Sequence, residues 1–229
     1  MDARERRLLS IVVNTNKTLF DARKKNEHRI ESIDFDIQEQ RMAQLIDISI
    51  KSMDAPLAAL RDEIYKLLRF AREYTDILEK HKVVNLYDAA EIIVEIDDVL
   101  RFKKFKNFLS YAGLAPIMKK GKNFYKISNK DINGVIVANK KQYPINYCEN
   151  LKIVLTRCAN KLIKHDYTYK QYYHKMHCYY KKEHPDYPQK QIEHMALKKV
   201  TVKFAKYIYD EFTKIAIYEK EEIKKYGDR

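Results

Sequence analysis

The sequence predicts an all-α fold, in which a helical hairpin or coiled-coil arm precedes a compact helical domain with a basic loop or small ribbon. Only 4 Gly and 5 Pro occur in 229 residues, whereas a sheet-rich fold needs many tight turns. Apolar residues also recur at steps of three and four along most of the chain, which is the spacing of one helix face. The hydrophobic fraction of 45% is typical of a globular protein with a buried core.

Residues 1–80 predict the arm. A coiled-coil seam is indicated because the apolar positions alternate at steps of three and four. The seam consists of Leu57, Leu60, Ile64, Leu67, Ala71, Tyr74 and Leu78. Asp54 precedes Ala55 and Pro56, and these residue types predict an N-cap and a first helical turn at that point.

A second helical pattern precedes the seam, at Ile30, Ile33, Ile37, Met42, Leu45 and Ile48. The two segments can pair with each other as a hairpin or with a second subunit, because three heptads are short for a free coiled coil. We predict that the arm dimerises, and that the protein is a homodimer or a higher homo-oligomer.

Residues 81–229 predict the second domain, which follows a junction at His81 to Val84. Helix faces are indicated at Ala89 to Ile96, at Phe105 to Leu109, at Leu151 to Leu162 and, with many tyrosines, at Asp166 to Tyr180. Tyr111 to Ser128 predicts the loop or ribbon, and His184 to Gln189 carries two prolines and predicts a turn. A long final helix shows apolar residues at strict four-residue spacing, at Ile192, Ala196, Val200, Phe204, Ile208 and Phe212.

The net charge of +13 is concentrated in one segment. Residues 101–141 carry 11 basic side chains and a single acid, Asp131, whereas residues 1–80 carry 15 of each sign. Such a block is the electrostatic footprint of a polyanion partner, and DNA is the partner we expect first. The alternative is a Lys-rich surface of the kind that an A+T-rich or thermophilic genome encodes.

The location predicted from the sequence is the cytoplasm, with nucleoid association if the source is prokaryotic. Three cysteines without CxxC spacing fit a reducing compartment. No apolar run approaches the roughly 18 residues that span a bilayer, so no membrane partner is expected.

The stretch from Asp88 to Pro116 reads DAAEIIVEIDDVLRFKKFKNFLSYAGLAP. It resembles the signature of the C-terminal transposase domain of the IS110 family of insertion-sequence transposases, which are bridge-RNA-guided DEDD recombinases. The matching positions are Ala89, Ala90, Glu95, Ile96, Asp98, Arg101, Phe102 and the unbroken run from Ser110 to Pro116. A weaker similarity, which includes the family's coiled-coil linker, covers about residues 1–215.

The sequence departs from the family at the metal centre. Family members hold two metals with four acids of an N-terminal RNase-H-like domain, and the opening MDARERRLL resembles only the helix of the last acid, with Asp2 in its place. One carboxylate cannot hold two metals, because each ion needs several oxygen ligands. We accordingly predict no metal site and no cofactor.

The family's nucleophilic serine is also missing. It follows YAGLAP by about five residues, where this sequence reads IMKKGK from Ile117 to Lys122. The nearest hydroxyls are those of Tyr125 and Ser128, and we transfer the nucleophile's role to neither. A phosphate-binding hairpin of the family needs Gly at two places that are filled here by Val83 and Asn85, so this phosphate site is in doubt as well.

The candidate nucleic-acid-binding residues are basic side chains on the short helix and on the loop that follows. They are Arg101, Lys103, Lys104, Lys106, Lys119, Lys120, Lys122, Lys126 and Lys130. The alternative for the helix is a solvated amphipathic face.

Fifteen of the 18 tyrosines lie from Tyr111 onward, and they can stack on unpaired bases or cover the edge of the core. His174, His177, Cys178 and His184 lack the spacing of a structural zinc site.

The leading hypothesis is a non-catalytic, transposase-derived DNA-binding protein that occupies, bridges or bends DNA. One alternative is a truncated recombinase subunit that performs strand transfer with an active site supplied by a partner. Another is a scaffold that binds structured RNA. Whether the protein is an enzyme stays open at this point, with a non-enzyme favoured.

Overall fold

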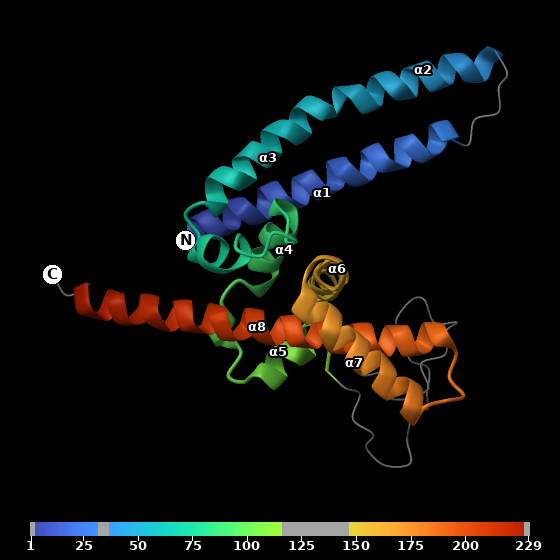
Figure 1. The fold of residues 1–229 in the computed structure, drawn as a ribbon. Helices are drawn as coiled ribbons and strands as arrows, with labels where there is room; N and C mark the ends of the chain where they lie inside the picture. Colours follow the sequence, from blue (N-terminus) through green and yellow to red (C-terminus); the bar gives the residue numbers. More distant parts are fainter. Residues whose placement is uncertain (1–2, 32–36, 116–146, 227–229) are drawn as a thin grey trace, which may run out of the picture.

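The computed structural model describes residues 3–31, 37–115 and 147–226 (Figure 1). Every regular element among these residues is a helix and none is a strand, which confirms the all-α class. Of the basic loop or small ribbon expected from Tyr111 to Ser128, Tyr111 is the last residue of a helix, and residues 116–128 lie outside the described residues. None of the described helices combines the length and apolar character needed to cross a bilayer.

The N-terminal arm is a helical hairpin (Figure 1). α1 (Ala3–Glu31) packs along α2 (Ile37–Ser52) and α3 (Asp54–Leu68), which together run antiparallel to it. The hairpin is therefore formed within one chain, but the pairing expected between the pattern of residues 30–48 and the seam is wrong. α2 and α3 lie on the same side of the hairpin, and α1 packs against both. Pairing with a second subunit stays a prediction.

α2 and α3 are separated by a single residue, Met53, whose N–H donates to the carbonyl of Ile50 at 3.0 Å. Pro56 explains the break, because it has no N–H and its ring crowds the carbonyl four residues earlier. α3 begins at Asp54 as expected, but the expected cap is wrong: Met53 occupies the N-cap without a side-chain bond. The carboxylate of Asp54 instead pairs with Arg23 on α1, so it ties the two sides of the hairpin together.

The seam from Leu57 to Leu78 is divided between α3 and a second element. α3 ends at Leu68, and after a short turn the chain continues as the π-helix η1 (Glu73–Leu78). A single helix over the whole seam is therefore wrong. In η1 the N–H of Glu79 donates to the carbonyl of Tyr74 at 2.8 Å, and this wider turn buries neighbouring side chains together. The buried residues of η1 are Glu73, Tyr74, Ile77 and Leu78.

The seam residues face different surroundings in the folded chain. Ile64, Tyr74 and Leu78 are buried in its own core, whereas Leu57, Leu60 and Leu67 are half-buried on α3. On α2, the apolar row of the second pattern is exposed at Met42, Leu45 and Ile48, each more than half accessible.

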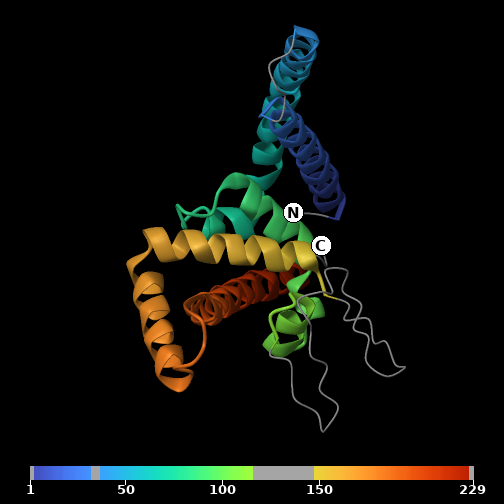
Figure 2. The same cartoon turned by 90° about the vertical axis from the view of Figure 1, so that its right-hand side faces the viewer.

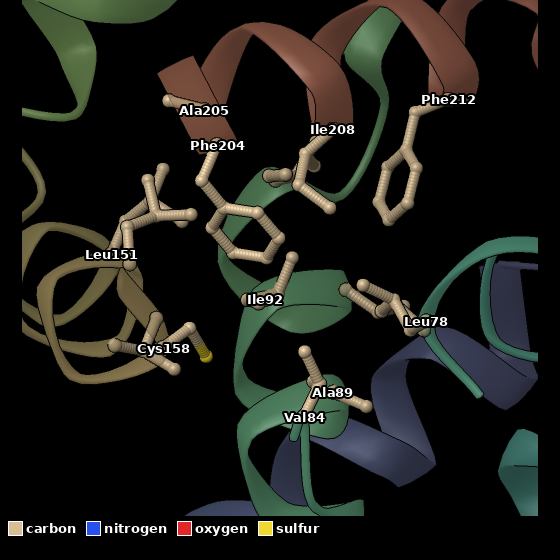
Figure 3. Close-up of a cluster of buried hydrophobic side chains, with 14 of the residues drawn as sticks. Leu78, Val84, Ala89, Ile92, Leu151, Cys158, Phe204, Ala205, Ile208 and Phe212 are labelled. Atoms are coloured by element: carbon tan, nitrogen blue, oxygen red, sulfur yellow. The ribbon is translucent and has the colours of Figure 1, made fainter. Parts of the chain in front are cut away.

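The core forms where α4 (Leu86–Ile96), α6 (Glu149–His165) and α8 (Gln189–Tyr226) meet (Figure 3). Ile92 of α4, Cys158 of α6 and Phe204 of α8 all point into it. Leu9 and Val13 of α1 belong to the same cluster, so the base of the arm is anchored in this core. The apolar faces predicted for all three core helices are buried: Ala89, Ile92, Ile93, Ile96, Leu151, Val154, Leu155, Cys158, Leu162, Ile192, Ala196, Val200, Phe204, Ile208 and Phe212.

The remaining elements flank α8. α7 (Tyr167–Glu183) begins after Asp166, whose carboxylate accepts a bond from the N–H of Tyr169 at 3.1 Å. A 3₁₀ turn, η2 (Val99–Arg101), and the short helix α5 (Phe105–Tyr111) also pack on α8. In both views α6 lies above α8 and α5 below it (Figures 1 and 2).

Candidate nucleic-acid interface

The segment from η2 to α5 rests on an aromatic base. Phe102 and Phe108 meet edge to face with ring centroids 5.4 Å apart, and Phe105 and Phe108 each lie 5.6 Å from the ring of Tyr209 on α8. The hydroxyl of Tyr209 donates to the carbonyl of Phe102 at 3.0 Å. Aromatic burial and this bond together fix α5 on α8.

Arg101 is held in place at the edge of this base. Its guanidinium lies over the rings of Phe102 and Tyr111, at 4.7 and 4.5 Å from their centroids. Its Nη2 donates to the carbonyl of Glu95 at 3.1 Å, and that carbonyl also accepts the hydroxyl of Tyr111 at 3.1 Å. The side chain is nevertheless exposed, so a positioned guanidinium faces solvent with donors to spare.

Lys103, Lys104 and Lys106 are also exposed, and none forms an ion pair with a described residue. Elsewhere in the described chain, surface lysines such as Lys51, Lys66 and Lys214 pair with an acid three or four residues away. The short segment from Arg101 to Lys106 contains no acid, so its four charges stay uncompensated. We call these four residues, Arg101, Lys103, Lys104 and Lys106, the α5 basic surface.

The SYAGLA run ends α5 in a Schellman motif. The N–H of Leu114 donates to the carbonyl of Leu109 at 2.9 Å, and the N–H of Gly113 donates to that of Ser110 at 3.1 Å. Gly113 has a φ of 63°, and a Cβ there would lie 2.6 Å from Cδ2 of Tyr147. Only glycine meets both demands, so this residue of the motif has a structural role.

The acid of the motif, Glu95, is fully engaged by the start of α6. Its Oε2 accepts from Sγ of Cys148 at 2.9 Å, and its Oε1 accepts from the side-chain amide of Asn150, also at 2.9 Å. Burial, and then the bond to this carboxylate, raise the pKa of the Cys148 thiol. Glu95 therefore connects α4 to α6 and is not a free catalytic acid.

The doubtful phosphate site at Val83 to Asn85 has an ordinary backbone. Asp97 is the one non-glycine residue with a positive φ in the described part of the chain, so Val83 and Val84 adopt no left-handed conformation. Val84 is buried, and Asn85 caps α4 by accepting the N–H of Asp88 at 2.8 Å. These residues serve packing and capping.

A cleft of about 750 Å³ lies beside Arg101 and brings in residues from the two ends of the chain. Arg6 and Arg7 of α1 and Lys220 of α8 line it, but Glu95, Asp97, Asp98 and Glu219 do so too. Arg6 is already bound to Glu73 at 2.7 Å and to the carbonyl of Asp97. The acids balance the bases in this cleft, which makes it a poorer polyanion site than the α5 basic surface.

Arg6 and Tyr209 were missed by sequence reasoning. Arg6 lies in the electrically neutral arm and its partners lie far along the sequence, so no local signal marks it. Tyr209 follows the helical pattern of the last helix without standing out from it.

Several sequence candidates fall within residues 116–146 and lie outside the described residues. They are Lys119, Lys120, Lys122, Lys126 and Lys130 among the binding candidates, and Tyr125 and Ser128 among the hydroxyls. Their roles stay predictions.

The tyrosines of α7 differ in burial. Tyr169 is buried and Tyr172 and Tyr173 pack partly against the core, whereas Tyr167 and Tyr179 are exposed. His184 stacks on Tyr187 with centroids 4.6 Å apart. Among residues 3–31, 37–115 and 147–226, no three His, Cys, Asp or Glu side chains are grouped as metal ligands would be.

Comparison with known proteins gives one match. Residues 75–126 match the Transposase IS116/IS110/IS902 family, over less than a quarter of the chain. This range runs from η1 through α4 and α5 and contains the whole α5 basic surface. No curated protein and no solved structure matches the chain.

Proposed function

We propose that this chain, whose residues 75–126 belong to the IS116/IS110/IS902 transposase family, is a DNA-binding protein that occupies, bridges or bends DNA without cutting it. The family match confirms the resemblance seen in the sequence and supports a transposase-related role. The observation that carries the proposal is the α5 basic surface, which presents four exposed cations without acidic partners next to a segment that aromatic contacts anchor on α8.

Such a surface suits the phosphate backbone of a duplex. Each phosphate neutralised by Lys or Arg releases condensed counterions. The logarithm of the association constant therefore falls linearly with the logarithm of the salt concentration, with a slope of about −0.9 per contact. Lys103, Lys104 and Lys106 can move to meet phosphates, while Arg101 is already positioned and can donate two parallel bonds.

The test is the salt dependence of duplex DNA binding between about 50 and 200 mM. We expect the triple variant Lys103→Gln, Lys104→Gln, Lys106→Gln to reduce the magnitude of this salt slope by about 2.7, because three phosphate contacts are lost. The variant should also bind more weakly at every salt concentration. The matched control is Lys24→Gln, Lys25→Gln, Lys80→Gln, which removes the same charge from exposed positions elsewhere. Equal effects of the two variants would show that only net charge matters and would refute the assigned surface.

The absence of cutting is proposed because the position of the family's nucleophilic serine falls in IMKKGK, from Ile117 to Lys122, which contains no hydroxyl. Incubation with supercoiled and cruciform DNA plus Mg²⁺ tests it. Intact DNA is the expected result. Cleavage, strand transfer or a covalent adduct would favour the recombinase-subunit alternative, and loss of that activity on Tyr125→Phe or Ser128→Ala would identify the residue.

Whether the bound nucleic acid is DNA or RNA is tested by treating the material that co-purifies with the protein with DNase and RNase. We expect it to be sensitive to DNase. Sensitivity to RNase alone would instead favour the scaffold that binds structured RNA.

We also propose that the arm joins two chains. Its support is the exposed apolar row of α2, at Met42, Leu45 and Ile48, because a lone helix face of this kind is costly to leave in water. Light scattering should give a dimer or a higher oligomer for the protein, and a smaller species when the three residues are changed to Ser.

A further inference from the structure

A second basic face lies on α6, on the other side of α8 from α5 (Figures 1 and 2). The outward side of α6 forms a shallow groove of about 540 Å³ that His194 of α8 also lines. Lys152 and Lys164 stand near its two ends, twelve residues apart, which is about 18 Å along a helix. That length corresponds to about five base pairs of a duplex at 3.4 Å each.

The middle of the groove is held in place by a buried acid. Asp88 of α4 is buried, and its Oδ1 accepts from Nε of Arg157 at 2.6 Å while its Oδ2 accepts from Nζ of Lys161. Arg157 also pairs with Glu91. These two cations are already neutralised, so they position α6 and add little charge to the groove.

The ends of the groove differ, because their cations have no acidic partner. Lys152 and Lys164 are exposed and form no ion pair with any described residue. Lys198 and Lys199 of α8 extend the charge beside Lys152. The ammonium of Lys198 is crowded by surrounding atoms, and this desolvation, followed by the charges of Lys152 and Lys199, lowers its pKa. Like charges packed this closely gain from an anion placed among them.

The polar residues of the groove complement these cations. Thr156 and Asn160 lie on the same face of α6 between Lys152 and Lys164, and the side chain of Asn160 is exposed. The amide of Asn160 can donate to phosphate oxygens alongside Lys, whereas the hydroxyl of Thr156 already donates to the carbonyl of Lys152 at 2.8 Å. The single acid at the rim is Glu149.

We propose that this α6 groove, lined by Lys152 and Lys164 and flanked by Lys198 of α8, is a second binding site for a nucleic-acid phosphate backbone. One chain then holds two duplex segments, one on α5 and one on α6. The inference rests on the proposed DNA-binding function and adds a physical means of bridging that does not require a second subunit.

The test counts duplexes bound per chain, which is independent of the oligomeric state. Isothermal titration of the full chain with a 12-bp DNA duplex at about 50 mM salt, where electrostatic binding is strong, should give two duplexes per chain. The variant Lys152→Gln, Lys164→Gln, Lys198→Gln should give one. The α5 triple variant should also give one, and the Lys24→Gln, Lys25→Gln, Lys80→Gln control should give two.

The outcomes separate the two ideas. The second site is refuted, and the α5 surface stands, if the α6 variant still binds two duplexes. The same holds if the unchanged protein binds one duplex and the α6 variant keeps the salt slope of the unchanged protein. If instead the α5 variant still binds two duplexes and the α6 variant binds one, the proposed α5 surface fails and the groove stands. Circular dichroism should show unchanged melting of all three variants, because none of the altered lysines forms an ion pair with a described residue.

A 12-bp RNA duplex of the same sequence distinguishes the source of the phosphate. Two RNA duplexes per chain would show that the groove reads only the backbone. One RNA duplex, lost in the α6 variant and retained in the α5 variant, would assign the groove to RNA.

Discussion

Two basic regions of this protein use the same residue types in opposite ways. Around α5, the guanidinium of Arg101 lies over two aromatic rings, and Lys103, Lys104 and Lys106 beside it are exposed and form no ion pair with a described residue. Between α4 and α6, Arg157 and Lys161 converge on the buried carboxylate of Asp88. The cations of the first region remain available to a partner, whereas those of the second are neutralised by Asp88 and hold α4 and α6 together. A count of lysines and arginines does not separate the two, whereas the position of the acids does.

The largest effect should come from removing the cations of the buried region. In the variant Arg157→Met, Lys161→Met the buried carboxylate of Asp88 loses both partners, and we expect a loss of about 3–5 kcal/mol in the free energy of unfolding. Asp88→Asn should cost less, about 1–3 kcal/mol, because Arg157 and Lys161 are partly exposed and can turn to water. Urea unfolding measures both. Equal losses would mean that the acid is not the buried partner.

Alkaline pH should weaken the same buried region. Burial, and then the nearby charge of Asp88, raise the pKa of the Cys158 thiol from 9.0 to about 12, and burial raises that of Tyr169 from 10.0 to about 12. Well below pH 9 both groups are protonated in either state and their contribution is intact. As the pH rises past 9.0 for the thiol and past 10.0 for the tyrosine, the unfolded chain ionises first, so stability falls by up to about 1.4 kcal/mol per pH unit for each group.

Chemical denaturation from pH 8 to 11 checks this slope. Cys158→Ala should make it shallower at the cost of lower stability at pH 8, because the thiol fills the core. A slope equal to that of the unchanged protein would contradict the assignment to Cys158. The exposed Cys178 gives the matched comparison, since Cys178→Ala should change neither value.

A substitution at Gly113, at the end of α5, should destabilise the protein. Gly113→Ala meets both a φ of 63° and the ring of Tyr147, and we expect a loss of about 2–3 kcal/mol in unfolding free energy. Ser110→Ala, an exposed position of the same motif, should change it by less than about 0.5 kcal/mol. If Gly113→Ala costs as little, Tyr147 does not pack where it is described.

The smallest effect is expected at Tyr209. Tyr209→Phe keeps the ring contacts of α5 and removes one hydrogen bond, to the carbonyl of Phe102, so the loss should be about 0.5–1.5 kcal/mol. Thermal unfolding measures it. Amide exchange should also quicken in α5 and stay unchanged in α6, because the bond serves only the first of the two regions.

The sequence predicted best where a helix has one apolar face. The residues from Leu151 to Leu162 and from Ile192 to Phe212 are buried as their spacing requires, because α6 and α8 each cover one side of the core. The break before Asp54 was also predicted, because Asp54 and Pro56 mark a helix start. The turn before η1 was not, because the apolar spacing continues across it as in one uninterrupted helix.

The candidate site was predicted in part for a related reason. Arg101, Lys103, Lys104 and Lys106 are adjacent in sequence, so a linear charge count finds them. The lysines of the α6 groove are diluted by 11 acids over residues 142–229, and only the helical geometry places Lys152 and Lys164 in one groove with a single acid, Glu149. Asp88 was recognised as part of a motif, but its ion pairs join residues about 70 positions apart.

The motif around Gly113 also closes a junction in the chain. The N–H of Cys148 donates to the carbonyl of Tyr111 at 2.7 Å, and Tyr147 lies against Gly113, so the chain departs and returns at one closed junction. Extending the stretch between such anchors costs little, since the closure entropy grows only with the logarithm of length. The described contacts thus hold the two ends of the junction together at a cost that depends little on the length of chain between them.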